Sequence, residues 1–149
     1  MNKLKWWFRI YGTLYVLMGL GNLYIVLLNP QGMADSLPSA MASSPLVVQA
    51  FSDAWSPFAF DVLGIGLFLL WASRNPLKHI SVVWFVVWLE FLHGSLDDLF
   101  LIARGYDATT YIVFGVVHIA IIVTGVLFAR EGATQLSPSA QSLTQKNAL

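Results

Sequence analysis

This sequence lacks cysteine and is poor in charged residues. It contains no cysteine, and only 11% of its 149 residues are charged, whereas soluble domains average about 25%. The missing cysteine excludes disulfide bonds, thiol catalysis and cysteine-ligated metal centres. Eight basic residues balance eight acidic ones, so charge predicts no nucleic-acid partner. The sequence also has no phosphate-binding glycine loop, no Gly-x-Ser-x-Gly and no His-Glu-x-x-His.

Long apolar runs dominate instead. Hydrophobic residues make up 57% of the chain, and the mean hydropathy is +0.68. The runs cover residues 6–28, 54–73, 80–103 and 110–129. Each is close to the roughly 20 residues with which a helix crosses a bilayer, and none alternates in polarity as barrel strands do. The sequence therefore predicts an all-α integral membrane protein, a bundle of four transmembrane helices whose main partner is the lipid bilayer.

The distribution of basic residues predicts the orientation. Seven of the eight fall before or at the start of the first run, between the second and third, or after the fourth, and Arg104 alone lies on the other side. Cytoplasmic loops carry such an excess of Lys and Arg, so both termini are predicted to be cytoplasmic. Residues 1–131 would form the membrane domain. Residues 132–149, rich in Ser, Gln, Ala and Thr, would form a flexible cytoplasmic tail.

Local signals mark the ends of the predicted helices. Ser44 followed by Pro45 is typical of a helix start, and the turn around Asn75-Pro76 should end the second span. Gly105 is placed to cap the third. The aromatic residues near the predicted span ends are expected to anchor at the membrane interface; these are Trp6, Trp7, Tyr24, Trp55 and Trp71.

Small and polar residues recur at helical spacing along two of the runs. The first carries Gly12, Tyr15, Gly19 and Asn22, and the fourth carries Tyr111, Gly115, His118 and Gly125. Such stripes let helix backbones approach closely. We expect both faces to point into the bundle.

The third run is unusually polar. Glu90, His93, Asp97 and Arg104 are spaced by 3, 4 and 7 residues, which places them on one helix face, with Asp98 about 100° around from Asp97. Charged groups at membrane depth are costly and usually face a protein interior or a wet cavity. Asn22 and Asp61 fall at a similar depth in the outer half. We therefore predict one pocket that opens outward, with these candidate binding residues: Asn22, Asp61, Glu90, His93, Asp97, Arg104 and His118.

Three interpretations of this cluster remain open. It is a hydrogen-bonded network that fixes helix packing, with Asp61 or Glu90 protonated or paired to a histidine. Alternatively, it is a site for binding or transporting a small molecule. The third interpretation is a metal site for zinc or non-haem iron, formed by Glu90, His93, His118 and Asp61. Glu90-x-x-His93 has the spacing of the di-metal bundles, although those need two such elements and two further glutamates.

Several segments together resemble one family. The opening Trp6-Trp7-Phe8-Arg9-Ile10-Tyr11-Gly12, the segment Ala50-Phe51-Ser52-Asp53-Ala54-Trp55, the turn Ser73-Arg74-Asn75-Pro76 and the stretch Ile102-Ala103-Arg104-Gly105-Tyr106 are similar to the BphX-like family. The resemblance covers about residues 3–130. It implies a small four-helix protein of the bacterial cytoplasmic (inner) membrane, and it brings no established biochemical activity with it.

These observations favour a small membrane protein that binds, transports or assists the metabolism of a small apolar compound through a buried acidic and histidine pocket. The alternative is a membrane enzyme that uses a histidine–carboxylate metal site or acid–base pair. A third interpretation is a structural subunit of a homo-oligomer or larger membrane complex. The sequence alone does not choose a substrate or a reaction.

Overall fold

The computed structural model describes residues 2–136, and its regular secondary structure there is helical throughout. Four of its helical segments are long and apolar enough to span a membrane, which confirms the predicted fold class. They are α1 (Asn2–Leu28), α4 (Pro45–Ala72), a third segment over Pro76–Ala103, and α7 (Ala108–Gln135). The third is made of η1 (Pro76–His79), α5 (Ile80–Leu89), the π-helical η2 (Glu90–Leu96) and α6 (Asp97–Ala103).

Local sequence signals are realised where they were expected. The Ser44 side chain accepts a hydrogen bond from the Val47 N–H at the start of α4, and Pro45 occupies its first turn. Helix α4 ends at Ala72, before the Asn75-Pro76 turn. Gly105 has a φ of +88°, the left-handed conformation that follows many helix ends and that glycine adopts without steric cost.

Helices extend beyond the apolar runs in two places. The segment between the first two spans contains α2 (Pro30–Ser36) and α3 (Ser39–Ala42). Helix α7 continues to Gln135, beyond residue 129, where the fourth apolar run ends. The predicted division into a membrane domain over residues 1–131 and a tail over residues 132–149 stays a prediction. Most of the predicted tail, residues 137–149, lies outside the described residues, and its flexibility stays a prediction.

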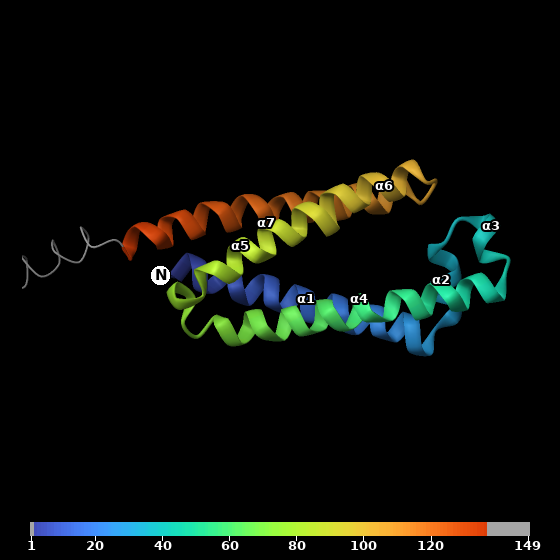
Figure 1. Cartoon of the computed structure of the whole chain (residues 1–149), viewed down its shortest axis with the longest axis horizontal. Coiled ribbons are helices and arrows are strands. Elements are labelled where there is room, and N and C mark those ends of the chain that lie inside the picture. The colour runs from blue at the N-terminus through green and yellow to red at the C-terminus, as the bar shows by residue number, and fades with distance from the viewer. Residues whose placement is uncertain (1, 137–149) are drawn as a thin grey trace, which may run out of the picture.

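The four spans form two helical hairpins (Figure 1). Helix α1 packs along α4, and the third span packs along α7. Glycines allow the first hairpin to be tight. A Cβ at Gly19 would lie 2.7 Å from the backbone of Leu63, and one at Gly66 would lie 2.6 Å from the Val16 nitrogen. The predicted role of the small-residue stripe in close backbone contact is confirmed.

The hairpins meet at the end of the molecule where α1 begins and α7 ends (Figure 1). The Lys3 ammonium lies 3.0 Å from the Glu131 carboxylate there, so both ends of the described chain lie at the same end of the molecule. The main buried cluster fills this region, which we call the closed end. Its residues include Leu4, Trp7, Phe8, Leu69, Ala72, Val83 and Ala129.

The prediction that Trp7 anchors at the membrane interface is wrong. Its ring is only 2% exposed and packs edge-on against Phe8 and Tyr11, so it belongs to the core and not to an interfacial belt. Trp6, Tyr24 and Trp71 are exposed, as interfacial residues would be.

At the opposite end, which we call the open end, the hairpins diverge (Figure 1). Helices α2 and α3 cover the α1–α4 hairpin there, around a small second cluster of Met33, Leu37 and Val48. Tyr106, from the turn before α7, packs against this cluster. The molecule is therefore wedge-shaped, because its two hairpins are packed together at the closed end and diverge toward the open end (Figure 1).

Candidate functional site

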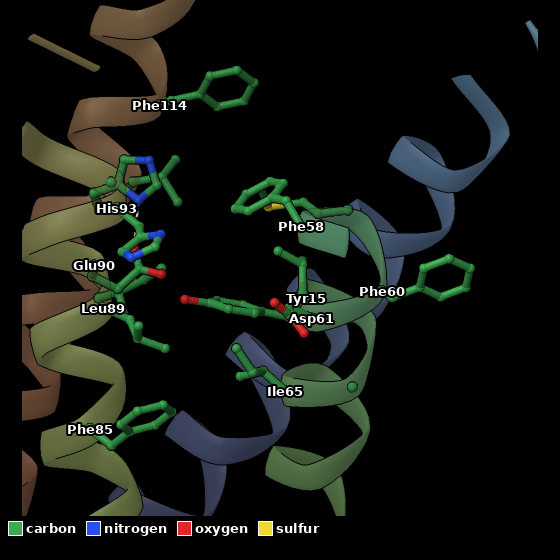
Figure 2. Close-up of a pocket in the computed structure, with 17 residues that line it drawn as sticks. Tyr15, Phe58, Phe60, Asp61, Ile65, Phe85, Leu89, Glu90, His93 and Phe114 are labelled. Atoms are coloured by element: carbon green, nitrogen blue, oxygen red, sulfur yellow. Dashed lines mark hydrogen bonds and ion pairs between the residues drawn. The ribbon is translucent and has the colours of Figure 1, made fainter. Parts of the chain in front are cut away.

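A cavity of about 630 Å³ lies between the two hairpins. Each of the four spans contributes to its wall. Most of the wall is apolar, and Figure 2 shows Tyr15, Phe58, Phe85 and Phe114 around it. Its ionisable side chains other than tyrosine are Asp61, Glu90, His93 and His118. The site is thus an apolar chamber with a few polar groups.

The central polar contact joins the third span to α7. His118 Nδ1 lies 2.5 Å from Glu90 Oε2, and the Glu90 side chain is only 6% exposed. A buried carboxylate is costly unless it is hydrogen-bonded, and separating a buried pair leaves its charge uncompensated. This contact therefore holds two helices of one hairpin together and fixes both side chains in the cavity wall.

The π-helix η2 brings a second carboxylate, that of Asp98, close to the other ring nitrogen of His118. His118 Nε2 lies 3.5 Å from Asp98 Oδ2, a buried oxygen that makes no hydrogen bond with the described residues. A π-helical turn inserts extra backbone into a helix. Asp98 rather than Asp97 thereby comes to the side of α7. Short π-helical segments are frequent at functional sites.

Of the two glycines near this cluster, only Gly94 makes room that a larger residue would fill. A Cβ at Gly94 would lie 2.5 Å from the His118 ring, and one at Gly115 would lie 3.8 Å from Asp98 Oδ2. Since a real Cβ contact at the first distance does not occur, Gly94 is required for the ring to lie against η2. A Cβ at Gly115 would be in ordinary van der Waals contact with Asp98, so glycine is not required there.

His93 and Asp61 are placed differently from the Glu90–His118 pair. Both line the cavity, and both are exposed in the chain taken alone. Neither makes a side-chain hydrogen bond or ion pair with the residues described. Asp61 belongs to α4 and stands across the cavity from Glu90 and His93 (Figure 2). These two side chains are free to meet a ligand.

The structure does not bring the other three predicted site residues to the cavity wall. Asn22 donates to the Met18 carbonyl at 2.9 Å and accepts from Trp55 Nε1 at 2.8 Å. Arg104 is exposed and lies over the Phe100 ring, 5.0 Å from its centroid. Asp97 is half-buried beside the cavity but outside its lining. A direct role for these three in binding stays a prediction.

The metal interpretation has limited geometric support. Across residues 2–136, no three His, Asp or Glu side chains are grouped closely enough to hold a metal ion. Of the four residues named for it, Glu90 and His118 are in contact, while Asp61 stands on the opposite wall (Figure 2). A site for zinc or non-haem iron stays a prediction.

Sequence reasoning missed the aromatic part of the site. Tyr15 was recognised only as part of a packing stripe, yet its ring reaches across the cavity with the hydroxyl directed toward the side of Glu90 (Figure 2). Phe58, Phe85 and Phe114 carry no signal that separates them from other apolar span residues. Asp98 was noted next to Asp97, but a regular α-helix would have turned it away.

Four long apolar helices around a mostly apolar cavity define the chain as a multi-pass helical membrane protein with a buried His–carboxylate cluster. The chain belongs to the BphX-like family, whose model matches residues 1–135. This confirms the resemblance found in the sequence. The chain matches no curated protein and no solved structure.

Proposed function

We propose that this protein binds a small, largely apolar compound in the cavity between its two hairpins. The observation that carries the proposal is the cavity itself, about 630 Å³ in volume and walled by aromatic and aliphatic side chains. Ligand sites typically occupy about 300–1,000 Å³ and combine an apolar lining with a few placed polar groups. An apolar compound dissolved in the bilayer would reach such a site without crossing water.

The polar groups have the arrangement expected of a site that orients a ligand. Glu90 and His118 hold each other in place at 2.5 Å, so their positions do not depend on the ligand. His93 and Asp61 line the cavity and make no hydrogen bond with described residues. Ionisable groups within a membrane-spanning helix are costly and are usually paired. A ligand with one polar group would supply a partner that the protein does not.

The test uses naphthalene-1-methanol, a rigid neutral probe with one hydroxyl, titrated into the full-length protein in a non-ionic detergent. Two glycine variants form a matched pair, because a Cβ at either Gly64 or Gly21 meets nothing within 4 Å. Gly64 lines the cavity and Gly21 does not. Gly64→Trp should abolish saturable binding by filling the cavity, whereas Gly21→Trp should bind like the wild type.

Binding is measured by calorimetry at fixed detergent concentration, so partitioning of the probe into micelles is the same for all three proteins. Saturable binding that survives Gly64→Trp would place the probe elsewhere and contradict the proposal. Equal, unsaturable heats in all three proteins would mean that only the micelle takes up the probe, which also contradicts it.

A second candidate function is acid–base catalysis on a compound held in the same cavity. One observation favours it: His118 stands between two carboxylates, Glu90 at 2.5 Å and Asp98 at 3.5 Å. A histidine paired with carboxylates can accept a proton from a substrate and return it, if the substrate lies within hydrogen-bond reach. The test is exchange of the α-protons of 1-tetralone in deuterated water, followed by NMR. A catalytic pair predicts faster exchange with wild type than with Glu90→Gln, and equal rates exclude this role for the pair.

A further inference from the structure

The polar part of the cavity is acidic, without a permanent positive charge. Its lining contains two carboxylates, Asp61 and Glu90, and neither lysine nor arginine. The two histidines carry charge only when protonated. The side chains that reach the cavity therefore offer an anionic ligand no fixed counter-charge, while a cation would meet two carboxylates.

Asp61 is the carboxylate in greatest need of a partner. It lies in the middle of α4, and no described residue makes an ion pair or hydrogen bond with its side chain. An acid at membrane depth costs about 2.5–3.5 kcal/mol on insertion scales and is usually paired. Glu90 differs, because its Oε2 accepts from His118. Its Oε1 makes no hydrogen bond with the described residues, although the side chain is only 6% exposed.

Aromatic rings surround the space between these carboxylates. Tyr15, Phe58, Phe85 and Phe114 come from all four spans and line the cavity (Figure 2). The faces of aromatic rings attract cations, more strongly when the cation is removed from water. The same rings also provide apolar surface for the rest of a ligand. Charge and ring placement thus favour the same kind of molecule.

We propose, building on the proposed function, that the cavity is selective for an apolar cation, such as a hydrophobic primary amine. Its ammonium group lies between Asp61 and Glu90, and its apolar part lies among the four aromatic rings. Asp61 is the residue that determines this charge preference, because Glu90 is already engaged by His118.

Three naphthalene probes of similar shape test the preference at pH 7: 1-naphthylmethylamine as the cation, naphthalene-1-methanol as the neutral compound and 1-naphthoate as the anion. Calorimetry on the full-length protein in a non-ionic detergent should give the amine an affinity about tenfold or more above that of the alcohol, a difference that one well-placed charge pair provides. The naphthoate should bind most weakly.

Asp61→Asn should remove the preference for the amine and leave the affinity for the alcohol nearly unchanged. Asp53→Asn is the matched control, since it removes a carboxylate from the same helix outside the cavity, and it should keep the preference. Asp61→Glu retains the charge and should also keep the preference, so that it separates loss of charge from loss of folding.

Equal affinities for amine and alcohol in the wild type would overturn this inference and leave the proposed function standing. A preference that persists in Asp61→Asn would overturn the assignment to Asp61. No saturable binding of any of the three probes would overturn the proposed function itself, and the charge selectivity with it.

Discussion

The closed end of this bundle and the cavity between its hairpins are packed in different ways. At the closed end, Trp7, Phe8, Val83 and Ala129 are buried in a continuous apolar cluster. Between the hairpins, the side chains instead border a cavity, and polar groups replace apolar contacts. Lipid is as apolar as leucine, so membrane helices associate through close packing and hydrogen bonds and not through the hydrophobic effect. The closed end supplies that packing, which allows the rest of the wedge to remain open.

The largest effect expected from this comparison comes from truncating matched phenylalanines. Phe8 at the closed end is fully buried, whereas Phe85 in the cavity wall is 56% exposed. Phe8→Ala should lower the free energy of unfolding by about 3 kcal/mol because it leaves a void in a packed core. Phe85→Ala should change it much less. Reversible unfolding in mixed micelles measures both, and equal losses would show that the two regions are packed alike.

The next effect in size is the coupling energy between Glu90 and His118, whose contact holds the cavity wall within the second hairpin. Removing either partner of a buried pair leaves the other unsatisfied and costs about 3 kcal/mol or somewhat more. Glu90→Ala and His118→Ala should therefore be strongly non-additive, with a coupling of about 1–3 kcal/mol in a double-mutant cycle. A coupling near zero would mean that the two side chains do not interact in the folded protein.

Much of the bundle could be predicted from the sequence, and the reasons are local. The four runs were visible because each span must be apolar over its whole length. Ser44, Pro45 and Gly105 correctly predicted helix ends, because capping depends on neighbouring residues alone. Glu90 and His118 were both identified as site residues, since ionisable groups are rare and costly in membranes.

The remainder depends on contacts between distant residues. The π-helix over Glu90–Leu96 has no clear sequence signature, yet it decides that Asp98 and not Asp97 approaches His118. Trp7 near a span end looked interfacial, but packing against Phe8 and Tyr11 buries it. The divergence of the hairpins was likewise beyond prediction, because the angle between helices is set by side-chain packing along their whole contact.

A smaller difference in stability is expected between alanine substitutions at two glycines of α4, Gly66 in the α1–α4 contact and Gly64 in the cavity wall. Gly66 faces the α1 backbone, where an added Cβ would lie 2.6 Å from the Val16 nitrogen, whereas a Cβ at Gly64 meets nothing within 4 Å. Gly66→Ala should destabilise by about 1–3 kcal/mol through overpacking. Gly64→Ala should be neutral or stabilising by up to about 1 kcal/mol through helix propensity. Similar effects at both positions would argue against the close α1–α4 contact.

The smallest expected effect lies at the open end. The Thr110 hydroxyl and N–H donate to the Asp107 carboxylate, which caps α7, and these hydrogen bonds hold the pKa of Asp107 below its ordinary value. A lowered pKa in the folded state stabilises above the unfolded pKa, and this contribution disappears as the pH falls through the folded value. Asp107→Ala should therefore lower the melting temperature slightly at pH 7, and the difference from wild type should shrink below about pH 4. A difference independent of pH would exclude a charge-based cap.

The hairpins are joined at the closed end and diverge toward the open end (Figure 1). Because the chain has no cysteine, pairs of introduced cysteines can be spin-labelled without background. Ile10 and Leu127 form a pair near the closed end, and Leu28 and Thr109 form a pair near the open end, all four being exposed. Within each helix the two positions are 18 residues apart, about five full turns, so the labels point in the same directions in both pairs.

Double electron–electron resonance on these two pairs, in detergent and in lipid nanodiscs, measures this divergence. We expect a clearly longer mean distance for Leu28→Cys/Thr109→Cys than for Ile10→Cys/Leu127→Cys. Equal mean distances would show that the axes of α1 and α7 do not diverge. This would contradict the wedge shape and the cavity between the hairpins.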